Sequence, residues 1–409
     1  MLRCRTQGLR IPLALVAAVL VAEIAVVVLR PTDGVIAPNP VRVASYFSEP
    51  ELARAQEFRR PQLALFGVSL VFQGGLLVAL AYRPPRRVLR HLPRERLLGV
   101  AAAGAALALA LDAVTLPVSA ISRQRSIDVG LTTRSWPGWA QDVALSGAIG
   151  ALFAGSGAAL AVAAMRRFPR RWWLAAAGGV VLAGSAYTYA GPTVIDPLFN
   201  RFQALPPGPT RADVLELARR AGVDVGDVFV VDASKRTTGA NAYVTGLGDT
   251  KRVVLYDTLL QEFTRDEVRL VVAHELAHVH YRDVPRGLLF LLLVAPAGML
   301  AVKRITDRLA PEGPPSAATV PALALSLALV VTPVTWVSNQ LSRRVEARAD
   351  SYALRLTDAP AAFLSFERRI ALQNVADPDP PRISRFVLGT HPSIVERLGI
   401  GEAYRDGQR

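Results

Sequence analysis

The residues best suited to chemistry are two histidines four positions apart, His274 and His278, with a glutamate directly after the first. Residues four apart project from one face of a helix, so the two imidazoles can converge on one metal ion. Glu275 lies about 100° further round the helix, close enough to reach a water bound to that ion. This pattern predicts a zinc-dependent peptidase with Glu275 as the general base. Two surface histidines on an amphipathic helix are the alternative interpretation.

One ligand must come from elsewhere in the chain, because catalytic zinc takes three protein ligands and leaves a position for water. No histidine occurs between Tyr281 and Ser342, which favours a carboxylate. Glu346 and Asp350 lie four apart in a helix-forming stretch, where Glu346 can ligate the ion and Asp350 can orient an imidazole ligand. Carboxylates among arginines more often form a solvated face, so this pair gains its significance from the histidines. We expect one Zn²⁺ per chain.

The local sequence also predicts the helix that carries the histidines. Thr264 followed three residues later by Glu267 is a capping box, and a mainly apolar run continues the helix. His280 lies about 200° round that helix from His278, so it cannot share the ion. His91 lies in an arginine-dense loop and is interpreted as solvated.

The composition is typical of a membrane protein. Of 409 residues, 51% are hydrophobic and only 20% are charged. The net charge of +14 would suit nucleic acid, but the basic residues occur in short runs beside apolar stretches, which is typical of membrane-flanking charge. We therefore expect a lipid bilayer as partner and no nucleic acid. The one cysteine, Cys4, excludes an intrachain disulfide and argues against thiol catalysis.

Seven apolar stretches approach the ~20 residues that a helix needs to cross a bilayer. They are residues 11–29, 63–81, 97–118, 143–165, 172–190, 287–302 and 320–341. No convincing small-residue cleavage site follows the first stretch, so we interpret it as an anchor and not as a signal peptide. Glu23 and Asp112 fall inside spans and should face protein or water, because a lipid-facing carboxylate is costly.

These features divide the chain into four parts. Residues 1–191 form a membrane region with five transmembrane helices, and residues 284–341 add two more. Residues 192–283 form a soluble module with an edge strand and the histidine helix, and residues 342–409 form a C-terminal helical region with the third ligand and His391. The fold class is a mainly α-helical polytopic membrane protein with a small α+β zinc metalloprotease module. Within this module the pattern predicts a helix over residues 211–221 and strands over 228–231, 242–245 and 253–256.

Short motifs outside the histidine pair point to one family. They are Asp196 to Asn200, Ser234 to Arg236, Asn241 to Tyr243, Val254 to Leu260, Ser342 to Asp350 and His391 to Ser393. With these motifs the sequence resembles the type I CAAX prenyl protease family of integral-membrane zinc metalloendopeptidases, over nearly the whole chain.

The resemblance implies a barrel of about seven membrane helices that encloses a water-filled chamber, with the zinc site inside. It implies that the strand at Asn241, Ala242 and Tyr243 binds the backbone of a peptide or protein substrate as an added strand. It further implies that His391 assists at the substrate carbonyl.

The sequence leaves open the substrate, the cellular role and the orientation of the protein in the membrane. Arginine outnumbers lysine by 44 to 3, which indicates a GC-rich bacterial genome and hence a bacterial cell membrane, and no prenyl-binding surface is evident. Residues 279–283 look more like bacterial quality-control membrane proteases, which would use the same chemistry. A non-catalytic transporter or scaffold is the rival from another class, although it has no use for this ligand set. The distribution of basic residues mildly favours a cytoplasmic N-terminus, whereas the resemblance favours the opposite orientation.

Overall fold

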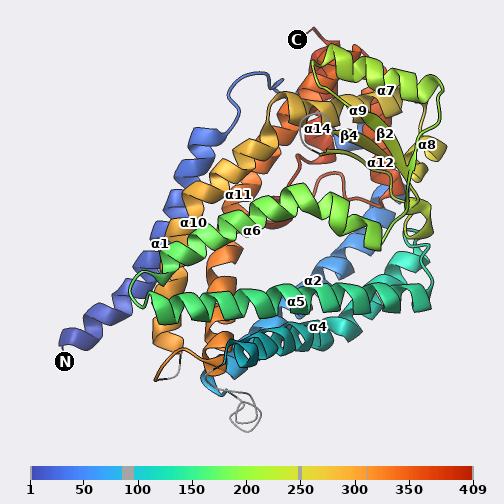
Figure 1. Cartoon of the computed structure of the whole chain (residues 1–409). Coiled ribbons are helices and arrows are strands. Elements are labelled where there is room, and N and C mark those ends of the chain that lie inside the picture. The colour runs from blue at the N-terminus through green and yellow to red at the C-terminus, as the bar shows by residue number, and fades with distance from the viewer. Residues whose placement is uncertain (1, 85–95, 247–250, 311, 408–409) are drawn as a thin grey trace.

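The computed structural model of the chain describes residues 2–84, 96–246, 251–310 and 312–407 and is mainly helical (Figure 1). His91 lies outside the described residues. Seven long helices correspond to the predicted spans. They are α1 (Leu2–Leu29), α2 (Glu49–Tyr82), α4 (Leu97–Asp128), α5 (Trp136–Arg167), α6 (Trp172–Val194), α10 (Asp283–Leu309) and α11 (Val320–Thr357).

Five of the described helices are long and apolar enough to cross a membrane. They are α2, α4, α5, α10 and α11, the last counted with the 3₁₀ turn before it. The apolar part of α1 is shorter, Leu13–Leu29. Helix α6, which we predicted as a span, is not among the five, and its place in the membrane stays a prediction.

The long helices close a ring. Contacts run from α11 to α2, then to α4, α5, α6 and α10, and α10 packs back on α11, while α1 packs on both α10 and α11 (Figure 1). Small residues permit the closest approach, because a Cβ added at Gly104 of α4 would lie only 2.7 Å from the Ala154 carbonyl oxygen of α5. Glu23 of α1 accepts a hydrogen bond of 3.1 Å from Gln340 of α11, so it faces protein as predicted. Asp112 is exposed, and its environment stays a prediction.

Each of the long helices extends beyond its predicted apolar stretch, and two of these extensions lie next to the histidine helix or carry Glu346. Helix α10 runs from Asp283 through Pro296 to Leu309, beyond the predicted span 287–302. Helix α11 is 38 residues long and joins the last span to the stretch that holds Glu346. The sequence predicted a boundary between the span that ends at Leu341 and the region that begins at Ser342. No glycine or proline lies at this point to end the helix, so the boundary falls inside one continuous helix. The carboxylates are therefore fixed rigidly to a membrane helix.

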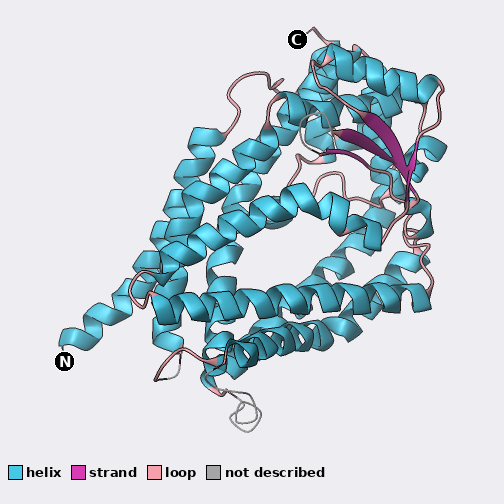
Figure 2. Ribbon diagram, viewed as in Figure 1, coloured by secondary structure: helices cyan, strands magenta, loops and turns pink. Residues whose placement is uncertain are grey.

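The soluble module contains a four-stranded sheet (Figure 2). The strand order is β1-β2-β4-β3, in which β2 and β4 are parallel and the outer strands are antiparallel to their neighbours. Strand β3 is therefore at the edge of the sheet, and within the described part of the chain no strand pairs with its other side. The strands β2 (Asp227–Val231), β3 (Ala242–Thr245) and β4 (Arg252–Tyr256) match the prediction within one residue, whereas the three-residue β1 (Phe202–Ala204) was not predicted.

The helices of the module cover the sheet and complete a buried core. They are α7 (Pro209–Arg220), α8 (Asp257–Glu262) and α9 (Arg265–His280). Leu276 of α9 is fully buried and packs in one cluster with Leu217 of α7 and Val253 and Leu255 of β4. Burial of this apolar face, at roughly 25 cal/mol per Å², holds α9 against the sheet. The opposite face of α9, which carries the histidines, points toward α11.

The motif Ser234 to Arg236 ties the module to the membrane ring. Arg236 forms an ion pair with Asp142 of α5, and its Nε donates to the Phe199 carbonyl at 3.1 Å. Ser234 N donates to Asp257 Oδ1 at 2.9 Å, which anchors the other end of the motif to the start of α8. The module thus has a fixed position relative to α5.

Three further helices follow α11: α12 (Pro360–Gln373), α13 (Arg382–Leu388) and α14 (Ile394–Arg405). Helix α12 packs on both α9 and α14. Short 3₁₀ turns lie at Val43–Ser45, Asp196–Leu198, Ala233–Lys235 and Ala317–Thr319. This packing brings the C-terminal region next to the histidine helix.

Candidate metal centre and active site

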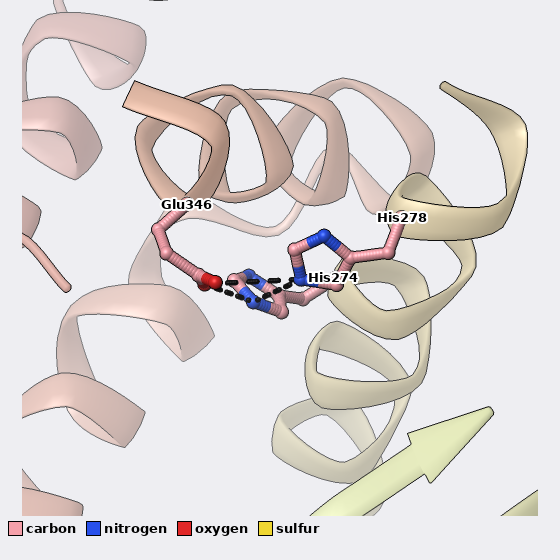
Figure 3. A group of neighbouring side chains, drawn as sticks. All are labelled: His274, His278 and Glu346. Carbon is pink, nitrogen blue, oxygen red and sulfur yellow. Dashed lines mark hydrogen bonds and ion pairs between the residues drawn. The ribbon is translucent and has the colours of Figure 1, made fainter. Parts of the chain in front are cut away.

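The two histidines and Glu346 come from different helices and point toward one another (Figure 3). His274 and His278 lie on α9, whose start is fixed by the predicted capping box: Thr264 N donates to the Glu267 carboxylate at 2.8 Å. Glu346 projects from α11 toward them.

The spacing of these three side chains suits a tetrahedral ion. The Nε2 of His274 lies 3.1 Å from Oε2 of Glu346 and 3.3 Å from Nε2 of His278. The distance from His278 Nε2 to Glu346 Oε2 is 3.8 Å. Ligands at 2.0–2.1 Å from a tetrahedral ion lie roughly 3.3 Å apart. The donor set therefore fits a metal with three protein ligands and leaves room for a fourth.

A carboxylate holds each imidazole from behind. The Nδ1 of His274 donates to Asp350 Oδ1 at 2.9 Å, and the Nδ1 of His278 donates to Asp283 Oδ2 at 3.1 Å. With the protons on Nδ1, both Nε2 atoms present lone pairs to the ion. The contact of Asp350 agrees with its predicted position, whereas our sequence reasoning missed Asp283. Asp283 could have been identified from its position just past the end of α9. There Arg282 adopts a left-handed φ of 55° and turns the chain back toward His278.

Arginines compensate both buried carboxylates. Arg397 of α14 donates from Nε and Nη2 to the two oxygens of Asp350, at 2.8 and 2.6 Å. Asp283 accepts from Arg286 at 2.9 Å and also pairs with Arg348, whose guanidinium lies 3.9 Å from the Tyr281 ring centroid. A buried carboxylate without such partners would be strongly destabilising. The sequence signal for Arg397 is its place six residues after His391.

Burial and hydrogen bonding shift the protonation of the site. Burial by itself lowers the pKa of His274, but hydrogen bonds to Asp350 and Glu346 outweigh it and raise the pKa well above its ordinary value. Burial raises the pKa of the Glu275 carboxyl, against the opposing effect of the two histidines. A base with a raised pKa holds a proton more readily near neutral pH, which suits proton transfer.

His391 stands at the edge of this group. Its Nε2 lies 3.3 Å from Oε2 of Glu346, and its Nδ1 lies 3.0 Å from the Thr390 hydroxyl oxygen. Although 56% of the His391 side chain is exposed, desolvation of its ring by the surrounding site lowers its pKa, which favours the neutral imidazole. His280 points away, with Nδ1 2.9 Å from the Ala221 carbonyl oxygen, as its position on the helix predicts.

Two cavities meet at Glu275. The larger, of about 550 Å³, runs along β3 past Tyr243, Val244 and Thr245 to His278. The smaller, of about 150 Å³, lies on the side of Asn241, His274 and His391. Glu275 lines both cavities, so the two cavities lie on either side of the proposed catalytic base.

The free edge of β3 can be assigned from its pairing. Tyr256 N donates to the Asn241 carbonyl at 3.0 Å, and pairing alternates along an antiparallel ladder. The backbone N–H and C=O groups of Ala242 and Val244 therefore point away from β4. In this structure Ala242 N is bound at 2.9 Å by the side chain of Asn241, which leaves the Val244 groups directed outward.

Comparisons with known proteins agree with a protease. Residues 208–400 match peptidase family M48. The uncharacterised metalloprotease YhfN of Bacillus subtilis is 30% identical over 371 residues, which cover 88% of this chain and 87% of that protein. The CAAX prenyl protease 1 homolog of Arabidopsis thaliana is 33% identical over 51% of this chain and 50% of its own length. The crystal structure of S. mikatae Ste24p has the same fold, with a TM-score of 0.76, 20% identity and coverage of 97% of this chain and 99% of that one.

The fold and the site together define a membrane-embedded protease. The chain belongs to peptidase family M48, a metalloprotease family, and it is a relative of the CAAX prenyl proteases, as the motifs predicted. It is an integral, multi-pass membrane protein. A relative over most of its length comes from a bacterium, which agrees with the origin that the arginine-rich composition indicates.

The first prediction concerns the carboxylate behind His278. Asp283→Asn should weaken metal affinity by about 10 to 100-fold, because the imidazole loses its orienting acceptor. Asp350→Asn should have an effect of the same size on His274. Competition with a chromogenic chelator measures this, with the exposed Glu216→Gln as control. Parental affinity in a folded Asp283→Asn protein would show that this carboxylate does not support the ligand.

The second prediction is a pH dependence of metal binding. The raised pKa of His274 means that the metal must displace a proton below that pKa. Apparent affinity should therefore weaken as pH falls, by up to about tenfold per pH unit for one proton. Asp350→Asn removes a hydrogen bond that raises this pKa, so its pH dependence should begin at lower pH. An affinity that is constant with pH would contradict proton competition at His274.

Proposed function

We propose that this chain is a zinc metalloendopeptidase that hydrolyses peptide bonds of extended peptide or protein segments. The observation that carries the proposal is the placement of three convergent ligand atoms beside Glu275, where two cavities and a free strand edge meet. Two imidazole nitrogens and one carboxylate oxygen at tetrahedral spacing suit Zn²⁺. His274, His278 and Glu346 are the proposed ligands.

The residues around the ion have separate roles in the proposed reaction. When bound, zinc supplies Lewis-acid chemistry: it polarises the scissile carbonyl and makes water acidic enough to lose a proton near neutral pH. Glu275 takes that proton and later passes it to the leaving amine. In the tautomer in which the Thr390 hydroxyl donates to Nδ1, neutral His391 carries its proton on Nε2 and can donate to the oxyanion. Asp350 and Asp283 hold the imidazoles.

Substrate recognition follows from the free edge of β3. A peptide added along β3, beside the predicted segment Asn241, Ala242 and Tyr243, would pair with outward backbone groups such as those of Val244, so recognition depends mainly on an extended conformation. The plant and yeast relatives are named for CAAX proteins. For this chain we propose the broader class of extended peptide and protein substrates, which includes damaged membrane proteins in a quality-control role.

The third prediction separates catalysis from metal binding. Glu275→Gln keeps the size of the side chain and removes the base, so zinc content and melting temperature should stay at parental values. Cleavage of an unstructured peptide by the purified enzyme in detergent should fall by about 10² to 10⁴-fold. A transporter or scaffold would be unaffected by this change. Parental cleavage by a zinc-loaded Glu275→Gln protein would refute the mechanism.

The fourth prediction tests the strand edge. Val244→Pro removes a backbone donor that points away from β4, so the ladder with β4 stays intact. We expect kcat/KM to fall by about threefold to tenfold, the range for one lost hydrogen bond. Val244→Ala is the control, since it shortens the side chain and keeps the donor. Equal kcat/KM for the proline and alanine variants would mean that substrate binds elsewhere.

A further inference from the structure

A further cavity, of about 420 Å³, lies beside α11 and has no part in the mechanism above. It is enclosed by the C-terminal end of α1, the loop that follows it, α11 and the start of α14. Arg344 of α11 lines this cavity two residues before Glu346, and so lies about 200° from it around the helix. The cavity therefore opens on a different face of α11 from the one that carries the proposed metal ligand.

Three arginines line this cavity, and two of them have no partner. Arg30 of α1 and Arg344 of α11 are exposed, and within the described part of the chain no group forms a hydrogen bond or ion pair with either guanidinium. The third, Arg343, donates from Nη1 to the carbonyl oxygens of Arg385 and Gly389, at 3.0 and 2.7 Å. Arg30 and Arg344 thus direct unused donors and positive charge toward one space.

Two carboxylates also line the cavity, and both already accept hydrogen bonds from other groups. Glu23 accepts from Gln340 at 3.1 Å. Glu396 accepts from the backbone N–H of Ser393 at 2.7 Å and from Arg385 at 3.2 Å. Neither carboxylate pairs with the two free guanidinium groups, so the cavity can accept an anion.

The arginines lie at the depth where two neighbouring helices leave the apolar layer. The apolar part of α1 ends at Leu29, directly before Arg30. The apolar stretch of α11 ends at Leu341, three residues before Arg344, and α1 packs on α11 outside the ring (Figure 1). Arginines at the end of a membrane helix lie near the lipid headgroups, which carry the phosphates.

Apolar surface adjoins the basic groups. Val26, Ile36 and Ile400 line the cavity together with the arginines. On α1, within one turn before Arg30, Val27 and Val28 expose 50% and 70% of their surface. These surfaces suit the glycerol and upper acyl segments of a lipid, whereas a soluble phosphate would gain nothing from them.

We propose that this cavity binds the phosphate of a glycerophospholipid headgroup, with Arg30 and Arg344 as its donors and the acyl chains along α1. Charge-assisted hydrogen bonds from guanidinium to phosphate are among the strong ones, and here they come from two helices that the lipid would join. Neither arginine contacts a proposed metal ligand or the proposed base, so this inference does not depend on the proposed peptidase function.

The test is a titration of the full-length, delipidated protein in detergent, followed by native mass spectrometry. The probes are dioleoylphosphatidylglycerol, dioleoylglycerol, which has the same chains without the phosphate, and inorganic phosphate, which has no chains. We expect one phosphatidylglycerol to bind at least about tenfold more tightly than dioleoylglycerol, the range for hydrogen bonds to a charged group. Inorganic phosphate at equal concentration should not displace the lipid.

Two substitutions assign the binding to the cavity. Arg30→Gln and Arg344→Gln should each weaken phosphatidylglycerol binding by about tenfold, because each removes a charged donor. The control is Arg170→Gln, which removes an exposed arginine that also flanks apolar stretches, between α5 and α6, and has no partner among the described residues. It should keep parental affinity, since general attraction of arginine to lipid is all that it loses.

The melting temperature of each lipid-free variant checks that it is folded. Parental affinity in both folded cavity variants, or an equal loss in Arg170→Gln, would overturn the site. Equal binding of the two lipids would show that the phosphate is not recognised. Displacement by inorganic phosphate at equal concentration would identify a site for free phosphate and overturn the lipid assignment.

Discussion

The direction in which each imidazole of the site presents its lone pair depends on the carboxylate bound to the opposite ring nitrogen. His274 and His278 can both offer Nε2 to one ion because Asp350 and Asp283 hold their Nδ1 protons. These carboxylates are buried, so each requires arginine, and the arginines come from α10, α11 and α14. The ligand geometry is therefore a property of four packed helices and not of the histidine motif alone.

The need to hold these carboxylates and arginines at fixed positions also explains why α11 continues past the membrane span without a break. Within one turn and a half it supplies the proposed ligand Glu346, then Arg348 for the carboxylate behind His278, then Asp350 for His274. A loop in this place could not hold three charged groups at fixed distances. The N-terminal part of α11 packs in the ring of membrane helices. The metal site, which lies further along the same helix, therefore has a fixed position relative to that ring.

The α+β module supplies the two histidines that face Glu346 of α11. Its apolar core presses α9 against the sheet, so that the histidines face α11 and the free edge of β3 lies beside Glu275. The pair between Arg236 and Asp142 fixes the module to α5. Ring and module thus define one space in which an extended chain can reach the ion.

Local patterns in the sequence determined much of this protein. Hydropathy located the long helices, period-2 runs located β2, β3 and β4, and the spacing of His274, Glu275 and His278 fixed which groups share a helix face, because these signals depend on neighbours along the chain. The three-residue β1 was too short to leave a pattern. Only tertiary structure decided that Asp283 turns back to His278, that Arg397 reaches Asp350, and that Arg30 and Arg344 line one cavity. These contacts join residues far apart in the chain or depend on a single left-handed residue, and no periodicity records them. The sequence thus determined which elements form and what chemistry they carry, and packing decided which buried charges meet.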